Sequence, residues 1–194
     1  MANSALLVMD VQNGVVQRYL DRSAEPERLL AALAEATTAA RFAGIPVIYV
    51  RAAFRSGAPE VSKRNRSFSA AVSSGGLGLG DPGTQVHAAV APQPDDIVVV
   101  KKRISAFIGS DLDVVLRSLE VDSLVLTGIA TSGVVLSTLR HAADLDFGLT
   151  VLRDGCADAD REVHRVLLEK VFPRQADVVT VDEWVERVVR PGGR

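Results

Sequence analysis

Residues 127–148, "TGIATSGVVLSTLRHAADLDFG", join the end of an apolar strand to the start of a helix. The apolar run 124–126 leads into a Thr-Gly turn, a few small residues follow, and a helical pattern begins near Gly133. A strand, a tight turn and a helix start often hold a nucleophile, because free amides at a helix N-terminus favour an anion or a developing oxyanion. Here glycine stands where a nucleophile would sit.

Around this turn, short apolar runs alternate with longer amphipathic segments. We expect strands at 5–10, 45–50, 96–101, 122–128, 149–154 and 176–181, and helices at 25–43, 110–120, 132–146, 159–171 and from about 182. Residues 51–96 read as irregular, with a short helix near 84–91. Nearly continuous apolar strands alternating with helices predict an open six-stranded parallel sheet with helices on both faces, a Rossmann-like three-layer α/β fold.

The size and composition of the chain narrow its class. With 194 residues and no linker, we expect one domain over 1–194. A net charge of −2 argues against nucleic acid as the main partner. Nothing approaches the ~18 apolar residues of a membrane span, and the N-terminus lacks a basic leader, so we expect a cytoplasmic protein without membrane contact. A single cysteine and no Cys/His cluster predict no metal and no cofactor.

Polar residues at strand ends are the first candidates for a site. In open parallel sheets the site lies beyond the carboxyl ends of the strands, which selects Asp10, Lys101, the 127–133 turn and Asp154 for one crevice. Asp10 follows five apolar residues, so its carboxyl is partly desolvated and its pKa is raised unless a cation compensates. Lys101 is a candidate for that cation, in a pair that handles a proton. From spacing alone, ordinary strand-end charges are the slightly favoured interpretation.

The turn itself offers backbone groups more than side chains. Gly128, Ala130 and Gly133 allow close backbone approach, and Thr131 or Ser132 could cap the helix. The functional interpretation is an anion site at free amides; the alternative is a Rossmann-type turn with small residues for packing. Ser132 reads as a cap, because no histidine is placed to activate it.

Several other features have two interpretations. The three isolated histidines read as surface or packing residues (His87, His141, His164). Cys156 reads as a small buried hydrophobe, with a nucleophile as the alternative. The basic segment 51–66 either attracts an anionic small molecule or is an ordinary solvated loop. The glycine-rich run 75–83 fits neither a dinucleotide fingerprint nor a P-loop, and reads as a loop or lid.

Three motifs in order carry a family resemblance. They are "LLVMDVQNG" (6–14), "VVVKKRISAF" (98–107) and "TGIATSGVVLSTLRHAADLDFGLTVLRDGCAD" (127–158). With them, nearly the whole chain resembles the isochorismatase-like hydrolases, the cysteine hydrolase superfamily. The resemblance implies a six-stranded parallel sheet, a homo-oligomer (dimer or tetramer), a small-molecule substrate and a catalytic Asp, Lys and Cys.

Two of those three catalytic positions are kept. The family's Asp matches Asp10 and its Lys matches Lys101, whereas its Cys falls at Gly133. The resemblance also implies a cis peptide near residues 129–130. It further implies these substrate-binding candidates: Gln12, Phe107, Ala130, Thr131, Ser132, Arg64 and Arg66. The two arginines lie where the alignment is loose. The metal motif of nicotinamidases has no counterpart in 51–66.

Loss of the cysteine speaks against the thioester mechanism of the family's amidases. Family members that cleave a vinyl ether and release pyruvate also carry glycine there, although they have Tyr-Ala-His where this chain has 130–132. Protonation of an enol carbon followed by water attack requires no thiolate. We therefore expect hydrolysis of a small anionic metabolite of the isochorismate type, with Asp10 as acid, Lys101 as its partner and amides near 130–133 binding the substrate. The alternatives are a silent ligand-binding homologue and a C–N amide hydrolase, for which Cys156 could serve as a relocated nucleophile.

Overall fold

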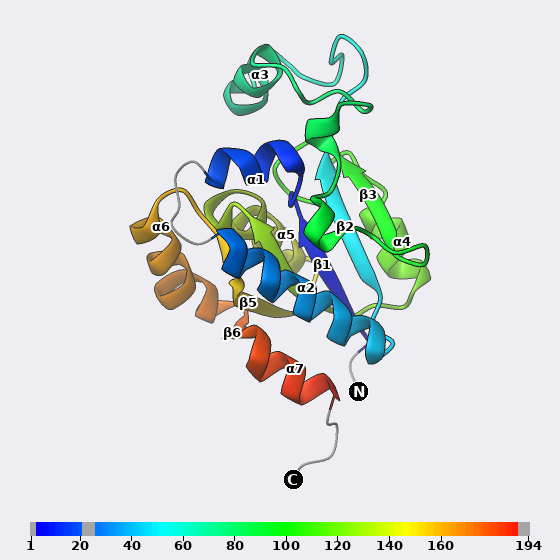
Figure 1. Ribbon diagram of the computed structural model, residues 1–194, viewed down its shortest axis with the longest axis vertical. Helices are drawn as coiled ribbons and strands as arrows, with labels where there is room; N and C mark the ends of the chain where they lie inside the picture. Colours follow the sequence, from blue (N-terminus) through cyan, green and yellow to red (C-terminus); the bar gives the residue numbers. More distant parts are fainter. Residues whose placement is uncertain (1–2, 21–25, 190–194) are drawn as a thin grey trace.

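A computed structural model of the protein describes residues 3–20 and 26–189. Its centre is a six-stranded, all-parallel sheet in the order β3-β2-β1-β4-β5-β6 (Figure 1). The strands are β1 (Ser4–Met9), β2 (Val47–Ala52), β3 (Ile97–Lys101), β4 (Ser123–Ile129), β5 (Gly148–Ala157) and β6 (Asp177–Val179). The predicted fold class is confirmed, and each expected strand is present within about three residues of its predicted ends.

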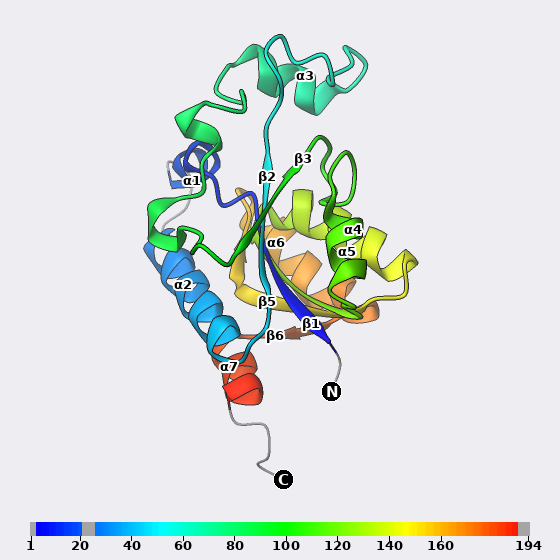
Figure 2. The ribbon, with the colours of Figure 1, turned by 90° about the vertical axis from the view of Figure 1, so that its right-hand side faces the viewer.

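Helices cover both faces of the sheet (Figure 2). One face packs against α1 (Asn13–Leu20), α2 (Pro26–Phe42) and α7 (Val181–Val189). The other packs against α4 (Leu112–Ser118), α5 (Leu136–Asp144) and the turn Leu167–Val171 that continues α6 (Arg161–Val166). Strands β1 and β4 lie in the middle, and their side chains point alternately into two apolar clusters. Within the described residues, no helix has the length and apolarity that a membrane span requires.

The structure departs from the sequence prediction where tertiary contacts override local pattern. Helix α1 was not predicted, because Gly14 has poor helix propensity. A Cβ at Gly14 would lie 3.3 Å from the carbonyl oxygen of Gly83, so its glycine allows a close chain approach. The short helix expected near 84–91 is two separate 3₁₀ turns, Pro82–Thr84 and Ala88–Val90.

Two of the predicted helices are also less regular than expected. The helix predicted at 132–146 begins with a π-helical turn, Thr131–Val135, and the one predicted at 159–171 ends with another, Leu167–Val171. A short helix that was not predicted, α3 (Arg66–Ser73), lies in the long excursion after β2, above the carboxyl edge of the sheet (Figure 1). π-Helical turns occur frequently at functional sites, and the first of these contains Gly133.

The contact between β1 and β4 requires glycine at position 128. Gly128 pairs with Met9 and has a φ of +134°, which side chains rarely adopt. A Cβ built there would lie 2.0 Å from the Met9 carbonyl oxygen. This close approach brings the end of β1, and therefore Asp10, beside the turn that follows β4.

We expect Gly128→Ala to destabilise the protein by more than about 3 kcal/mol, because backbone strain and a backbone clash occur together. Urea unfolding followed by circular dichroism measures this. Gly80→Ala is the matched control, since nothing lies within 4 Å of its Cβ position. Equal stability of the two variants would contradict the assignment.

Candidate functional site

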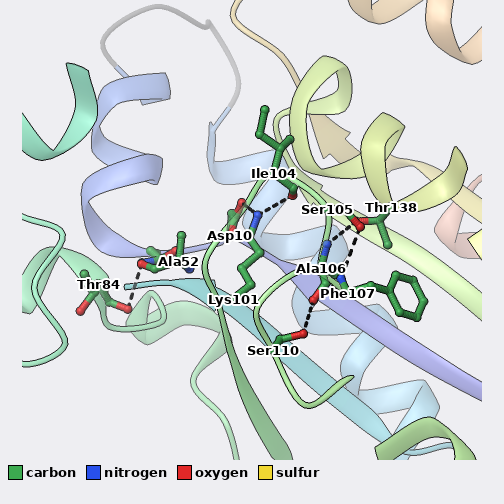
Figure 3. A network of polar contacts seen from close by, with 11 residues as sticks. Asp10, Ala52, Thr84, Lys101, Ile104, Ser105, Ala106, Phe107, Ser110 and Thr138 are labelled. Carbon is green, nitrogen blue, oxygen red and sulfur yellow. Dashed lines mark hydrogen bonds and ion pairs between the residues drawn. The ribbon is translucent and has the colours of Figure 1, made fainter. Parts of the chain in front are cut away.

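Asp10 and Lys101 form an ion pair at the carboxyl edge of the sheet. Lys101 Nζ lies 2.7 Å from Asp10 Oδ2, although β2 lies between their strands (Figure 3). Asp10 turns the chain out of β1 with a φ of +56°, while Lys101 Nζ also donates to the Ile104 carbonyl at 2.7 Å. Only 14% of the Asp10 side chain and 2% of the Lys101 side chain are exposed. The structure thus brings together the two charges that spacing alone left as ordinary strand ends.

The electrostatics of the pair favour proton transfer. Burial raises the pKa of the Asp10 carboxyl, and the charge and hydrogen bond of Lys101 offset that rise only in part. Among the described residues, Asp10 Oδ1 is buried and has no hydrogen-bond partner. A carboxyl in this state keeps its proton to higher pH than an exposed one and has an oxygen free to deliver it.

The turn after β4 contributes space rather than a nucleophile. Ile129-Ala130 is a cis peptide, as the resemblance implied. At Gly133, an added Cβ would meet only the Ala130 Cβ, at 3.6 Å. A Cβ therefore fits, in ordinary van der Waals contact, at the position that the resemblance aligns with the family's cysteine.

The expectation of free amides at 130–133 is wrong for two of the four. The Ser132 amide donates to Asp158 Oδ2 at 2.6 Å, and the Gly133 amide donates to the Ala130 carbonyl at 3.0 Å. Protein acceptors thus occupy the donors that would bind a substrate oxygen. Ser132 itself is exposed, and the N-cap residue, Ala130, forms no side-chain hydrogen bond to the helix.

The sequence analysis missed two residues that hold the turn. His164 Nδ1 lies 2.8 Å from the hydroxyl of Thr131, which is fully buried, and burial lowers the pKa of the His164 imidazole. Asp158 accepts the Ser132 amide. Both residues follow β5, so their position one strand from the turn, at the same sheet edge, was the signal available. The expectation of surface or packing roles for all three histidines was therefore incomplete.

Gln12 and Phe107 are buried in supporting positions. Gln12 is fully buried, and its amide group exchanges hydrogen bonds with both backbone groups of Ala52 and donates to the Thr84 carbonyl. Gln12 thus ties the end of β1 to β2. The Phe107 ring packs on His141 and Phe147 and points away from the ion pair (Figure 3). The structure shows packing and positioning contacts for these two side chains, and their contact with a substrate stays a prediction.

The basic segment is partly neutralised. Glu60 accepts from Arg55 at 2.6 Å, and its carbonyl accepts from Arg103 at 3.0 Å. Arg64 and Arg66 are exposed at the start of α3. Within the described parts of the chain, no contact joins either of them to Asp10 or Lys101, so their role in substrate binding stays a prediction.

Cys156 and Asp154 are not part of the ion-pair site. Cys156 is 5% exposed, and burial raises the pKa of its thiol to about 12, which opposes a role as nucleophile. Asp154 Oδ1 accepts the Val181 amide at 2.8 Å, at the start of α7. The expected single crevice therefore excludes Asp154. No cluster of three or more potential metal ligands occurs in residues 3–20 and 26–189.

Comparisons with known proteins agree over nearly the full chain. The isochorismatase domain family matches residues 4–183. The chain is 30% identical to an uncharacterized isochorismatase family protein, YecD, of Escherichia coli O157:H7, over 93% of both chains. It is 34% identical to the ureidoacrylate amidohydrolase RutB of Methylobacterium radiotolerans, over 96% of this chain and 77% of that one. A cysteine hydrolase from Pseudomonas syringae pv. phaseolicola has a similar structure, with a TM-score of 0.85, 26% identity, and 96% and 92% of the two chains covered.

Replacing Lys101 with an uncharged residue should make protein stability depend on the protonation of the buried Asp10 carboxyl. In Lys101→Met, burial persists while both causes that lower the Asp10 pKa are lost, so that pKa rises further above 3.8. When folding raises the pKa of a carboxyl group, the folded protein is relatively most stable at a pH below the unfolded-state pKa. This stability is lost as the pH rises through the folded-state pKa. The stability deficit of the variant should therefore grow between about pH 4 and pH 8, to about 3 kcal/mol. Urea unfolding across this range measures it.

Lys102→Met is the control for that experiment. It removes the same charge from the neighbouring residue, whose ammonium group donates to the Ala53 carbonyl and does not contact Asp10. If both variants show the same pH dependence, Asp10 is not responsible for it.

A thiol at position 133 should be reactive, in contrast to the native one. Gly133→Cys places a thiol at a partly exposed position in the turn before α5, whereas Cys156 is buried and burial raises the pKa of its thiol to about 12. With iodoacetamide at neutral pH, mass spectrometry should detect one rapid alkylation in the variant and none in the parent. Rapid alkylation of the parent would show that Cys156 is accessible.

Proposed function

The chain belongs to the isochorismatase family of hydrolases, and we propose that it hydrolyses a vinyl ether of a small anionic metabolite without a nucleophilic residue. The observation that supports this is the buried Asp10–Lys101 pair, together with a glycine at position 133 where an added Cβ would meet only the Ala130 Cβ. Compared with the family's catalytic set, the chain keeps the Asp and the Lys but has glycine where the resemblance places the cysteine. A vinyl ether is cleaved by acid catalysis, so its hydrolysis uses the groups that remain.

Asp10 acts as the general acid in the proposed reaction. Its protonated carboxyl donates the proton to the terminal enol carbon, and the electrons of the double bond form the new C–H bond. The ether carbon becomes an oxocarbenium ion, to which water adds. As the water adds, it gives one proton to Asp10, which restores the acid. The hemiketal then transfers its hydroxyl proton to the departing oxygen as the C–O bond breaks, releasing an alcohol and a 2-oxo acid.

Lys101 sets the proton affinity of that acid. Its ammonium group stabilises the carboxylate left after proton donation, and its hydrogen bond to the Ile104 carbonyl fixes its direction. Because Lys101 is almost fully buried, water screens this charge little. The balance between burial and Lys101 lets the carboxyl both hold a proton and release it.

The relatives support a small anionic substrate. RutB proteins similar to this chain are ureidoacrylate amidohydrolases, and an acrylate is an unsaturated carboxylate. The exposed cations of the excursion after β2, Arg64 and Arg66, are the candidates to attract such a carboxylate. Amide hydrolysis of the RutB type is the weaker assignment, because the position that resembles the family's cysteine is glycine.

A ligand-binding protein without turnover is the second candidate. This candidate is supported by the hydrogen bonds of the turn. Asp158 and the Ala130 carbonyl already accept the amides of Ser132 and Gly133, so these amides do not bind a substrate oxygen. Thermal shift with aromatic and amide metabolites, followed by measurement of ligand consumption, separates the two. Stabilisation without conversion favours binding alone.

The direct test is pyruvate release from isochorismate, followed by a coupled dehydrogenase assay. Asp10→Asn should lower kcat at least about 100-fold, because general acid catalysis contributes that much, and should leave the fold intact. Cys156→Ala should retain activity. An Asp10→Asn variant as active as the parent would eliminate Asp10 as the acid, and loss of activity in Cys156→Ala would favour the thiol.

A further inference from the structure

A cavity lies at the carboxyl edge of the sheet, separate from the ion pair. Its volume is about 570 Å³, within the range of small-molecule sites. Its walls come from the first turn of α2, the end of β5, α6 and the segment before α7. Neither Asp10, Lys101 nor Gly133 lines it.

The cavity combines an apolar floor with a charged rim. Three buried side chains contribute the floor: Leu29, Cys156 and Leu168. Arg153 and Arg161 are exposed on the rim, and within the described residues neither side chain forms a hydrogen bond or an ion pair. A ligand that suits both parts has an apolar body and an anionic group.

The acids that line the cavity are already engaged. Asp154 accepts the Val181 amide, Asp158 accepts the Ser132 amide, and Glu169 pairs with Arg165 at 2.6 Å. Arg165 is also paired with Glu162, at 2.7 Å. Asp154 and Asp158 keep their negative charge, but their oxygens accept backbone amides, whereas Arg153 and Arg161 are cations that no hydrogen bond or ion pair engages within the described residues. These two guanidinium groups are placed to bind a carboxylate, which guanidinium groups do in a bidentate manner.

Two wall residues connect this cavity to the turn at Gly133. His164 lines the cavity and its Nδ1 contacts the Thr131 hydroxyl, while Asp158 lines it and accepts the Ser132 amide. These contacts reach the two residues immediately before Gly133. A ligand in the cavity would therefore touch the side chains that hold the turn.

We propose that this cavity is a second binding site, for a small carboxylate with an apolar body, and that its occupancy is sensed at the Thr131–Ser132 turn. Arg153 and Arg161 bind the carboxylate, and the floor binds the apolar body. The proposal is independent of the reaction at Asp10, because none of its contacts involves the ion pair.

Benzoate is the probe, with benzamide as its uncharged counterpart and acetate as the carboxylate without an apolar body. Calorimetric titration of the full chain at fixed ionic strength should detect saturable benzoate binding, with benzamide and acetate each at least about tenfold weaker. The Arg153→Gln, Arg161→Gln double variant should lose benzoate affinity at least about tenfold. The Arg117→Gln, Arg174→Gln double variant removes the same charge from exposed positions outside the cavity and should bind as the parent does.

Imidazole NMR locates the ligand. The chain has three histidines, and His164 alone lines the cavity. Benzoate should shift the His164 ring resonances with the same concentration dependence as the binding heat in the calorimetric titration. It should leave the resonances of His87 and His141 unchanged. The response should persist in Asp10→Asn, which separates this site from the ion-pair site.

Three outcomes would overturn the proposal. They are benzoate binding unchanged in the Arg153/Arg161 double variant, equal binding of benzamide, and benzoate binding that leaves His164 unperturbed. Loss of benzoate binding in Asp10→Asn alone would place the ligand at the ion pair instead. Absence of turnover with isochorismate affects none of these measurements.

Discussion

The chemistry of this site depends on a carboxyl and an ammonium group that are withdrawn from water together. Removing two charges from water costs several kcal/mol per ion, and a close contact recovers this only when the remaining polar atoms are also satisfied. Lys101 is satisfied by Asp10 and by the Ile104 carbonyl. Asp10 is not, because Oδ1 is buried without a partner. The incomplete compensation raises the Asp10 pKa, so the pair is better suited to moving a proton than to stabilising the fold.

Backbone contacts bring that pair beside the turn. Gly128 allows β4 to approach the Met9 carbonyl, and Gln12 fixes the end of β1 against β2. Gln12 lies in the same motif as Asp10, and Gly128 lies in the same motif as Gly133. Each of the two holds the backbone of its motif in place. Resemblance to a functional motif therefore identifies the neighbourhood of a site and does not assign a chemical role to every residue in it.

The sequence was sufficient for the sheet and for the candidate acid and cation, because apolar strands and strand-end charges are local patterns. It was insufficient wherever a distant segment decided the outcome. Gly14 breaks the helical sequence pattern of α1, and the structure explains this glycine by the close approach of Gly83. The contacts of His164 and Asp158 with the turn cross from β5 and α6 to β4, and no local spacing encodes them. Asp154 was placed in the crevice by the strand-end rule, yet it holds the start of α7.

The turn bears on the choice between the two kinds of hydrolysis. Amide hydrolysis by this family's thiol route needs a nucleophile and donors for an oxyanion. Here glycine stands at the position that the resemblance aligns with the nucleophile, and Asp158 and the Ala130 carbonyl accept two of the amides. Vinyl ether hydrolysis passes through a cation, so it needs neither. It requires a proton donor whose conjugate base then faces the positive charge, and this is the role that we propose for Asp10. Two separate departures from a thiol mechanism thus leave the same proton-transfer chemistry intact.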